Sequence, residues 1–173
     1  MQLDVGDLVV YGNHGIGRVV ARRTAIVGGA ETETVVVELS DGMTITLALD
    51  QARTRLRSPL GPSDIPRVRE TLQTESAASS EPWLKRRRAI QARLSEGDPL
   101  AIAEIVREGA DRQRAKAARS TTLSAGEKAL YTRARQLLAG ELGVALDLDE
   151  AGANAWIDEH ALPAELRSGA GAD

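Results

Sequence analysis

The stretch that divides this chain is Glu81-Pro82-Trp83-Leu84-Lys85-Arg86-Arg87-Arg88. A run rich in Ser, Ala and Glu precedes it at residues 74–80 and predicts a linker. Pro82 suits the first turn of a helix, so a helix is predicted to begin here. Apolar residues before the linker follow strand patterns, and those after it follow helical spacing. The chain is therefore predicted to be α+β, with two domains.

Residues 1–60 predict a small β domain. A turn is expected at Gly28-Gly29 and a hairpin at Asp41-Gly42. Four or five short strands at this spacing predict a barrel of the SH3 or Tudor type. The predicted strands are residues 8–11, 19–27, 32–39, 43–47 and 54–57.

The remainder predicts helices. Residues 61–80 are expected to form a short helix, capped by Ser63, and then the linker. Residues 81–160 predict an all-α domain, and residues 161–173 a disordered tail. The first helix of that domain is predicted to have an apolar stripe formed by Leu84, Ile90 and Leu94. The other predicted features are a helix start at Gly97-Asp98-Pro99, an exposed extension or loop at Arg112–Ser120, a capping box at Ser124–Glu127 and a weaker helix at residues 149–160.

Composition excludes several classes of protein. The chain is 42% hydrophobic but only 2% aromatic, so its cores must be built from Val, Leu, Ile and Ala. It has no cysteine, which excludes disulfides, thiolate metal sites and a cysteine nucleophile. No apolar run approaches a membrane span and the N-terminus does not resemble a signal peptide. We therefore expect a soluble, cytoplasmic protein without membrane contact.

Charge is distributed unevenly along the chain. The net charge of −3 combines +5 over residues 81–142 with −6 over residues 143–173. A basic middle region is typical of nucleic-acid binding, but it is equally compatible with a solvated helical surface. Charge alone leaves both interpretations open.

Trp83 also has two interpretations. A tryptophan at a helix start often packs in the core. Four consecutive basic residues, Lys85 to Arg88, directly follow Leu84, and one helical turn cannot bury them all. Lysine and arginine attract phosphates, and an indole can wedge between bases, so a surface wedge is favoured. Trp156, in the acidic region, is interpreted as a docking residue for the last helix.

No catalytic constellation is present in the sequence. His14 and His160 are the only histidines, and neither has metal-ligand spacing. Gly15-Ile16-Gly17 lacks the third glycine of a dinucleotide fingerprint, and no phosphate-binding loop occurs. We expect no enzyme activity, no metal and no cofactor.

Three stretches, in order, match one known family. They are Val5-Gly6-Asp7-Leu8-Val9-Val10-Tyr11-Gly12-Asn13-His14-Gly15-Ile16-Gly17, Glu81-Pro82-Trp83 with its basic followers, and Leu123-Ser124-Ala125-Gly126-Glu127-Lys128 with the helix after it. They resemble the CarD/CdnL family of bacterial transcription regulators, whose N-terminal module is shared with transcription-repair coupling factor. Gly12 departs from the family, which usually has proline there.

The resemblance implies a Tudor-like domain at residues 1–60 that binds the lobe of the RNA polymerase β subunit. It also implies that residues 81–160 contact promoter DNA, without sequence preference, at the upstream edge of the transcription bubble. The family tryptophan, here Trp83, wedges into the minor groove while basic residues hold phosphates. The implied DNA-binding residues are Trp83, Lys85, Arg86, Arg87, Arg88 and Lys128. The implied polymerase contacts are Arg22, Arg23 and Thr46, the last at a position that is basic in some members.

The sequence therefore predicts a monomeric regulator, associated with the nucleoid through RNA polymerase, that stabilises the open promoter complex. One alternative is a Tudor-type adaptor with non-specific nucleic-acid binding. Another is an accessory domain of an enzyme such as a coupling factor, which the lack of a nucleotide-binding motif disfavours.

Overall fold

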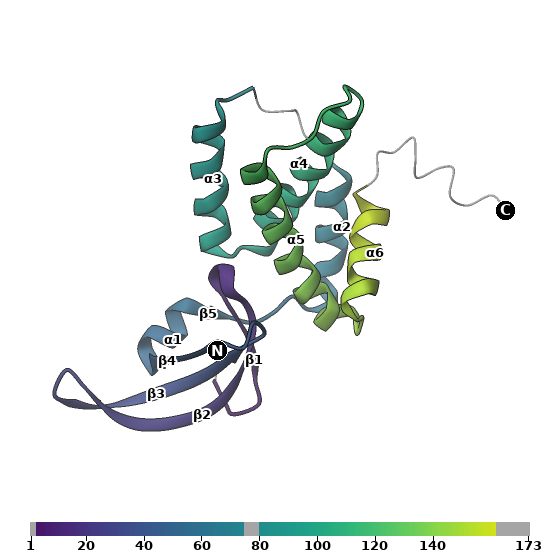
Figure 1. Cartoon of the computed structure of the whole chain (residues 1–173). Coiled ribbons are helices and arrows are strands. Elements are labelled where there is room, and N and C mark those ends of the chain that lie inside the picture. Colours follow the sequence, from purple (N-terminus) through teal and green to yellow (C-terminus); the bar gives the residue numbers. More distant parts are fainter. Residues whose placement is uncertain (1–2, 75–79, 162–173) are drawn as a thin grey trace. The chain divides into compact units, whose positions relative to one another are not determined.

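The computed structural model describes residues 3–74 and 80–161 of the 173. The chain divides into two compact units, residues 1–59 and residues 60–173. The first is an antiparallel sheet with one short helix, and the second consists of helices (Figure 1). No helix in the described ranges is both long and apolar enough to cross a membrane.

The sheet of the first unit has five antiparallel strands in the order β4-β3-β2-β1-β5. Within residues 3–59 no pairing joins the edge strands β4 and β5, so the predicted closure into a barrel is not shown. A 3-10 turn, η1 (Gly12–His14), separates the first two strands. The strands are β1 (Leu8–Tyr11), β2 (Gly15–Val27), β3 (Ala30–Leu39), β4 (Thr44–Ala48) and β5 (Leu56–Arg57).

Glycines decide how β2 and β3 pair. A turn was predicted at Gly28-Gly29, and the structure shows a two-residue hairpin there. Gly28 and Gly29 have φ of +62° and +87°, and such a turn requires positive φ at both positions. Gly17 lies where β2 meets β3 closely. A Cβ there would lie 2.7 Å from Val37 Cγ1, so a larger residue would push the strands apart.

A short helix, α1 (Leu49–Arg55), occupies a segment where no helix was predicted. The strand expected at residues 54–57 shrinks to β5 as a result. Leu49 and Ala52 lie three residues apart on one helical face and are both buried. They complete a core of aliphatic side chains from the strands and the N-terminal segment: Leu3, Val9, Val19, Val35, Val37, Leu39, Leu47 and Leu56.

The second unit is built around α4 and α5. Helix α2 packs against α4, helix α6 packs against α5, and α3 contacts both central helices (Figure 1). Its elements are η2 (Pro62–Asp64), α2 (Ile65–Gln73), α3 (Trp83–Glu96), α4 (Pro99–Ala117), α5 (Ala125–Leu146) and α6 (Glu150–His160). The segment Arg112–Ser120, expected as an extension or loop, is mostly the last turns of α4.

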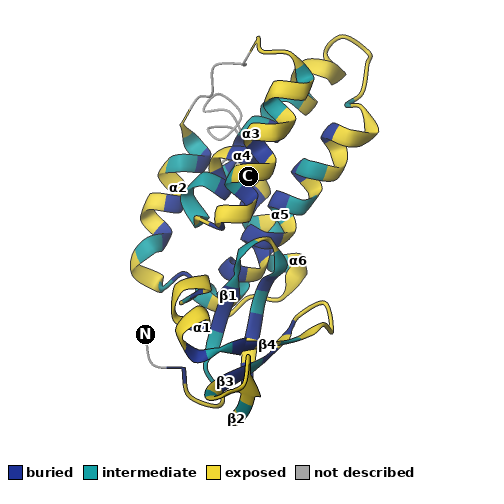
Figure 2. Ribbon diagram, turned by 90° about the vertical axis from the view of Figure 1, so that its left-hand side faces the viewer, coloured by how far each residue is buried: buried dark blue, intermediate teal, exposed yellow. Residues whose placement is uncertain are grey.

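Helix α2 is part of the helical core. Its residues Ile65, Val68 and Leu72 are buried in one cluster with residues of α3, α4, α5 and α6 (Figure 2). The segment 61–80, expected as a short helix and linker, therefore begins inside this unit, and residues 75–79 lie outside the described residues. Ser63 lies in η2 and is not the cap of α2, whose N-cap position is Asp64.

The apolar stripe predicted for α3 is wrong at Leu84. Ile90 and Leu94 are buried, but Leu84 is 66% exposed. Six residues of an α-helix turn through about 600°, which places Leu84 about 120° around the helix from Ile90. Leu84 therefore faces water with the basic residues and not the core.

Buried charged side chains bind main chain near both ends of the helical unit. Glu141 of α5 accepts a hydrogen bond from the Leu60 N–H at 3.1 Å. Arg107 of α4 donates to the Ala161 carbonyl at 2.7 Å. Ala161, expected in the disordered tail, is buried, and residues 162–173 lie outside the described residues.

Candidate nucleic-acid interface

The predicted basic stretch forms the start of α3. Pro82 occupies the N-cap position with extended backbone, φ −54° and ψ 143°, and Trp83 is the first helical residue. No side chain caps this helix. The Pro82 carbonyl accepts from the Lys85 and Arg86 N–H groups, which closes the first turn. The indole and the basic run therefore stand on regular helix, with fixed directions.

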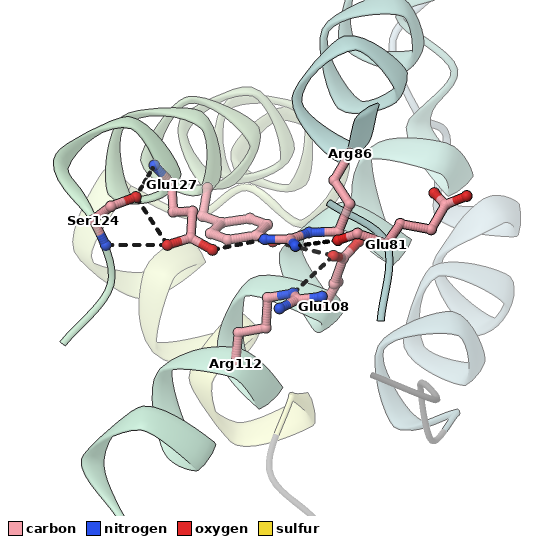
Figure 3. Close-up of polar contacts among 7 residues, drawn as sticks. Glu81, Arg86, Glu108, Arg112, Ser124 and Glu127 are labelled. Carbon is pink, nitrogen blue, oxygen red and sulfur yellow. Dashed lines mark hydrogen bonds and ion pairs between the residues drawn. The ribbon is translucent and has the colours of Figure 1, made fainter. Parts of the chain in front are cut away.

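Arg86 does not extend into water like its neighbours. Its Nη2 donates to Glu127 Oε1 of α5 at 2.8 Å, and its Nη1 donates to the Glu81 carbonyl at 2.8 Å (Figure 3). Both charged side chains of this pair are only 11% exposed. The guanidinium carbon also lies 5.4 Å from the centre of the Trp83 ring, within cation–π range.

Trp83 is half-buried, between the two interpretations of the sequence. Its ring lies against the first turn of α5. A Cβ on Gly126 would lie 3.2 Å from Trp83 Cζ2, which is tighter than ordinary contact. The indole thus rests on a helix start that has no side chain at the point of contact, with Arg86 against its ring.

Glu127 has two structural roles. As predicted, it forms a capping box with Ser124: Ser124 Oγ accepts from the Glu127 N–H at 3.3 Å, and Glu127 Oε2 accepts from the Ser124 N–H at 3.1 Å. Its other carboxylate oxygen accepts from Arg86. Burial alone raises the pKa of the Glu127 carboxyl, but bonds from Ser124 and the charges of Arg86 and Lys116 outweigh burial and hold this pKa below its usual 4.5.

A second polar cluster lies beside the first and joins α4 to α5. The Tyr131 hydroxyl donates to Glu108 Oε1 at 3.1 Å, and Arg112 Nε donates to the same oxygen at 3.0 Å (Figure 3). Burial, and then the charge of Glu108, raise the pKa of Tyr131 to about 12. A Cβ on Gly109 would lie 2.6 Å from Tyr131 Cγ, so α4 needs glycine here to accept the ring. The contact between α4 and α5 around Tyr131 is therefore tightly packed.

Family comparisons agree with this division of the chain. A family model described as CarD, C-terminal domain, matches residues 67–158. A second, described as CarD-like/TRCF RID domain, matches residues 3–59. The chain belongs to the CarD family. The CarD family is a family of non-enzymatic transcription factors, and its CarD-like domains are associated with RNA polymerase interaction.

The DNA-binding residues implied for this CarD-family chain fall into two groups. Lys85, Arg87, Arg88 and Lys128 are exposed, and Lys85 forms an ion pair with Glu81 at 2.5 Å. That pair raises the pKa of Lys85 through a hydrogen bond and the charge of Glu81. Trp83 and Arg86 form the second group, half-buried against α5.

Two of the implied polymerase contacts share one face of the sheet. Arg23 of β2 pairs with Thr34 of β3, and Thr46 of β4 pairs with Val36 of β3. Paired residues of adjacent strands lie on the same face, and residues two apart on one strand do as well. Arg23 and Thr46 are exposed on that face.

Arg22 lies on the opposite face. It pairs with Val35, a core residue, and its guanidinium binds Asp4 at 3.4 Å and Glu33 at 2.5 Å. These bonds join the N-terminal segment to the β2–β3 ladder. Arg22 thus has a structural role that Arg23 does not share.

Sequence reasoning missed the partner of Arg86. The capping box identified Glu127 as part of a helix start, but no local pattern connects two residues 41 positions apart. The useful signal was Gly126: a glycine inside a first helical turn is unfavourable unless another group approaches closely.

Proposed function

We propose that this CarD-family chain binds the RNA polymerase β subunit through its sheet unit and promoter DNA through its helical unit, and stabilises the open complex at the upstream edge of the bubble. The observation that carries the proposal is the half-buried Trp83 at the start of α3, beside the exposed cations Arg87 and Arg88.

The physical basis is differential binding. A ligand shifts an equilibrium only by its preference for one state. Inserting an indole into intact duplex costs a few kcal/mol of unstacking, roughly the loss of one step. At the edge of an unwound bubble part of that cost is already met, so Trp83 favours the open state. Exposed arginines add phosphate contacts that do not depend on sequence.

Tethering makes weak DNA contacts sufficient. If the sheet unit holds the chain on polymerase, the helical unit meets promoter DNA at a high effective concentration. Edge strand β4, which carries Thr46, exposes one row of backbone groups suited to pairing with a strand of another protein. This supports the sheet as the polymerase-binding unit.

The deciding experiment is the lifetime of open complexes formed by purified polymerase with and without the full chain. We expect the chain to lengthen the lifetime and Trp83→Ala to remove most of the gain. Binding to polymerase and DNA with no change in lifetime would instead support the adaptor function.

The polymerase contact is tested by pull-down of the β subunit with the full chain. Arg23→Glu and Thr46→Glu should each weaken capture, because both alter the exposed face, and leave folding unchanged. Arg22→Glu reverses the same charge one residue away, on the other face, but it also breaks the ion pairs with Asp4 and Glu33, so its stability is measured alongside its capture. If Arg22→Glu weakens capture without loss of stability and Arg23→Glu does not, the assigned face is wrong.

A further inference from the structure

Arg86 is chemically different from the basic residues around it. Its guanidinium has a carboxylate, a carbonyl and an indole ring as neighbours, whereas Arg87 and Arg88 on the same helix are exposed. The guanidinium is planar, and hydrogen bonds to two fixed acceptors hold it in one orientation, so a ring that packs against it is oriented as well. The side chain is placed to orient Trp83.

We propose that Arg86 is a positioning residue: with Glu127 it forms a latch that holds the Trp83 ring in its DNA-inserting orientation, and it does not itself bind phosphate. This inference rests on the proposed function of Trp83 and replaces the phosphate-binding role that the resemblance implied for Arg86.

The cost of releasing Arg86 supports the latch. If Arg86 moved to a phosphate, the Glu127 carboxylate would keep its charge in a site only 11% exposed, without its guanidinium partner. Breaking such a pair from one side is unfavourable because it leaves a desolvated charge uncompensated. Arg87 and Arg88 can bind phosphate without that cost.

A second reason is the sign of the local field. Glu127 is an acidic group directly beside the proposed DNA-inserting ring, where it would repel phosphates. The Arg86 guanidinium neutralises it at 2.8 Å. The latch thus fixes the ring and also removes an unfavourable charge from the approach path of DNA.

Gly126 completes the arrangement. Any side chain at this position would meet the indole, at 3.2 Å for a Cβ, and displace it from the α5 helix start. The ring is therefore bounded by Gly126 of α5 and by Arg86 of its own helix. Holding a side chain in its bound conformation before binding lowers the entropic cost of association.

The first test compares Arg86→Gln with Arg87→Gln in the full chain. Both remove one positive charge from α3. Arg86→Gln should shorten the open-complex lifetime by about two- to tenfold, the factor expected for ordering one large side chain on binding. Salt screens the uncompensated Glu127 charge, so the loss should shrink as salt rises but should persist at the higher concentration, where ordering of the ring remains. The loss from Arg87→Gln should shrink as salt rises, because a phosphate contact releases counterions.

A second comparison uses lysine. Arg86→Lys keeps the charge but loses the fork that reaches Glu127 and the Glu81 carbonyl together. If Arg86 acts as a latch, Arg86→Lys should be as defective as Arg86→Gln. If Arg86 binds a phosphate, Arg86→Lys should retain most of the function, because lysine also binds phosphate. Arg87→Lys is the matched control: it keeps the charge at an exposed site and should lose much less lifetime than Arg86→Lys.

Glu127→Gln isolates the ion pair from the helix cap, because glutamine also completes a capping box. We expect it to shorten the lifetime, and the double variant Arg86→Gln/Glu127→Gln to be no worse than either single variant. A longer lifetime for Glu127→Gln would overturn the latch, since it would mean that freeing Arg86 improves its contact with DNA.

The orientation of the ring has its own readout, independent of polymerase. With Trp156→Phe as background, Trp83 is the only tryptophan. Arg86→Gln and Glu127→Gln should shift its fluorescence to longer wavelength and increase acrylamide quenching, and Arg87→Gln should not. Identical spectra for Arg86→Gln and Arg87→Gln would overturn the latch. If Trp83→Ala leaves the lifetime unchanged, the proposed function fails, while the fluorescence comparison still decides the latch.

Discussion

The two tryptophans are buried to a similar degree but lie in regions of opposite net charge. Trp83 and Trp156 are both half-buried, and each lies on a helix that an arginine joins to α5. Arg86 of α3 reaches α5 near Trp83. Arg135 of α5 reaches α6, the helix that carries Trp156, through Asn154 and Asp158, each at 2.7 Å.

Their surroundings differ in sign. Residues 81–142 carry a net charge of +5, and residues 143–173 carry −6. Trp156 stacks on His160, with ring centres 4.0 Å apart, and its helix also carries Glu150, Asp158 and Glu159. Burial therefore does not distinguish the two indoles, whereas the charge of the surrounding residues does. This difference in charge is why we propose nucleic-acid binding for Trp83 alone.

The largest expected loss of stability comes from the contact between α3 and α5. Glu127→Ala removes half of the capping box and the partner of a mostly buried arginine, so we expect a loss of about 3 kcal/mol in the free energy of unfolding. Urea melts measure it. Glu127→Gln, which keeps the cap, should lose roughly half as much. Equal losses would assign the whole effect to the ion pair with Arg86, because glutamine keeps the cap.

Replacing each tryptophan by alanine should separate folding from function. We expect each change to cost about 2 kcal/mol of unfolding free energy, below a full core deletion, because each ring is half-buried. Trp83→Ala should also shorten the open-complex lifetime by roughly tenfold or more, from loss of an aromatic contact with a base. Trp156→Ala should not, at temperatures where both proteins are folded. Equal lifetime defects would remove the distinction between the two sites.

The α5–α6 junction should be less sensitive. Asp158 is 67% exposed, so its ion pair with Arg135 contributes at most about 1 kcal/mol. Arg135→Ala also loses hydrogen bonds to Asn154, and we expect about 1 kcal/mol in total. Asp158→Asn is the control and should cost less than half of that. A loss near that of Glu127→Ala would contradict the ranking by burial.

The smallest effect is the acid dependence of the latch. The folded state lowers the pKa of Glu127 below 4.5, so ionised Glu127 favours folding. This contribution is present above the unfolded pKa and is lost as pH falls through the folded pKa. Stability should therefore fall less between pH 5 and about pH 3 in Glu127→Gln than in the unmodified chain. Parallel curves from urea melts would exclude Glu127 as a contributor.

Sequence patterns predicted local features better than distant contacts. The turn at Gly28-Gly29 and the capping box of Ser124 depend on a few adjacent residues, and both are present. Helix α1 was missed because it is seven residues long and no side chain caps it. Leu84 was placed on the wrong face because apolar character was counted without the helical angle.

The sequence predicts which residues make up the candidate site, but it does not predict how they contact one another. A tryptophan beside four basic residues is visible in the sequence. Which of the four is withdrawn from solvent depends on Glu127, and that pairing exists only once α3 packs against α5. Tertiary contact thus gives one arginine a role that its neighbours do not have.

The main-chain bonds of Glu141 and Arg107 limit how the helical unit can be cut. Because their partners are the Leu60 N–H and the Ala161 carbonyl, a fragment that starts after residue 60 or stops before residue 161 leaves a buried charge without that bond. Substitution at either end keeps the bond, with one exception: proline at position 60 has no N–H to donate. Residues 60–161 are therefore the shortest span from which an autonomous helical fragment should be designed, even though the family match covers only residues 67–158.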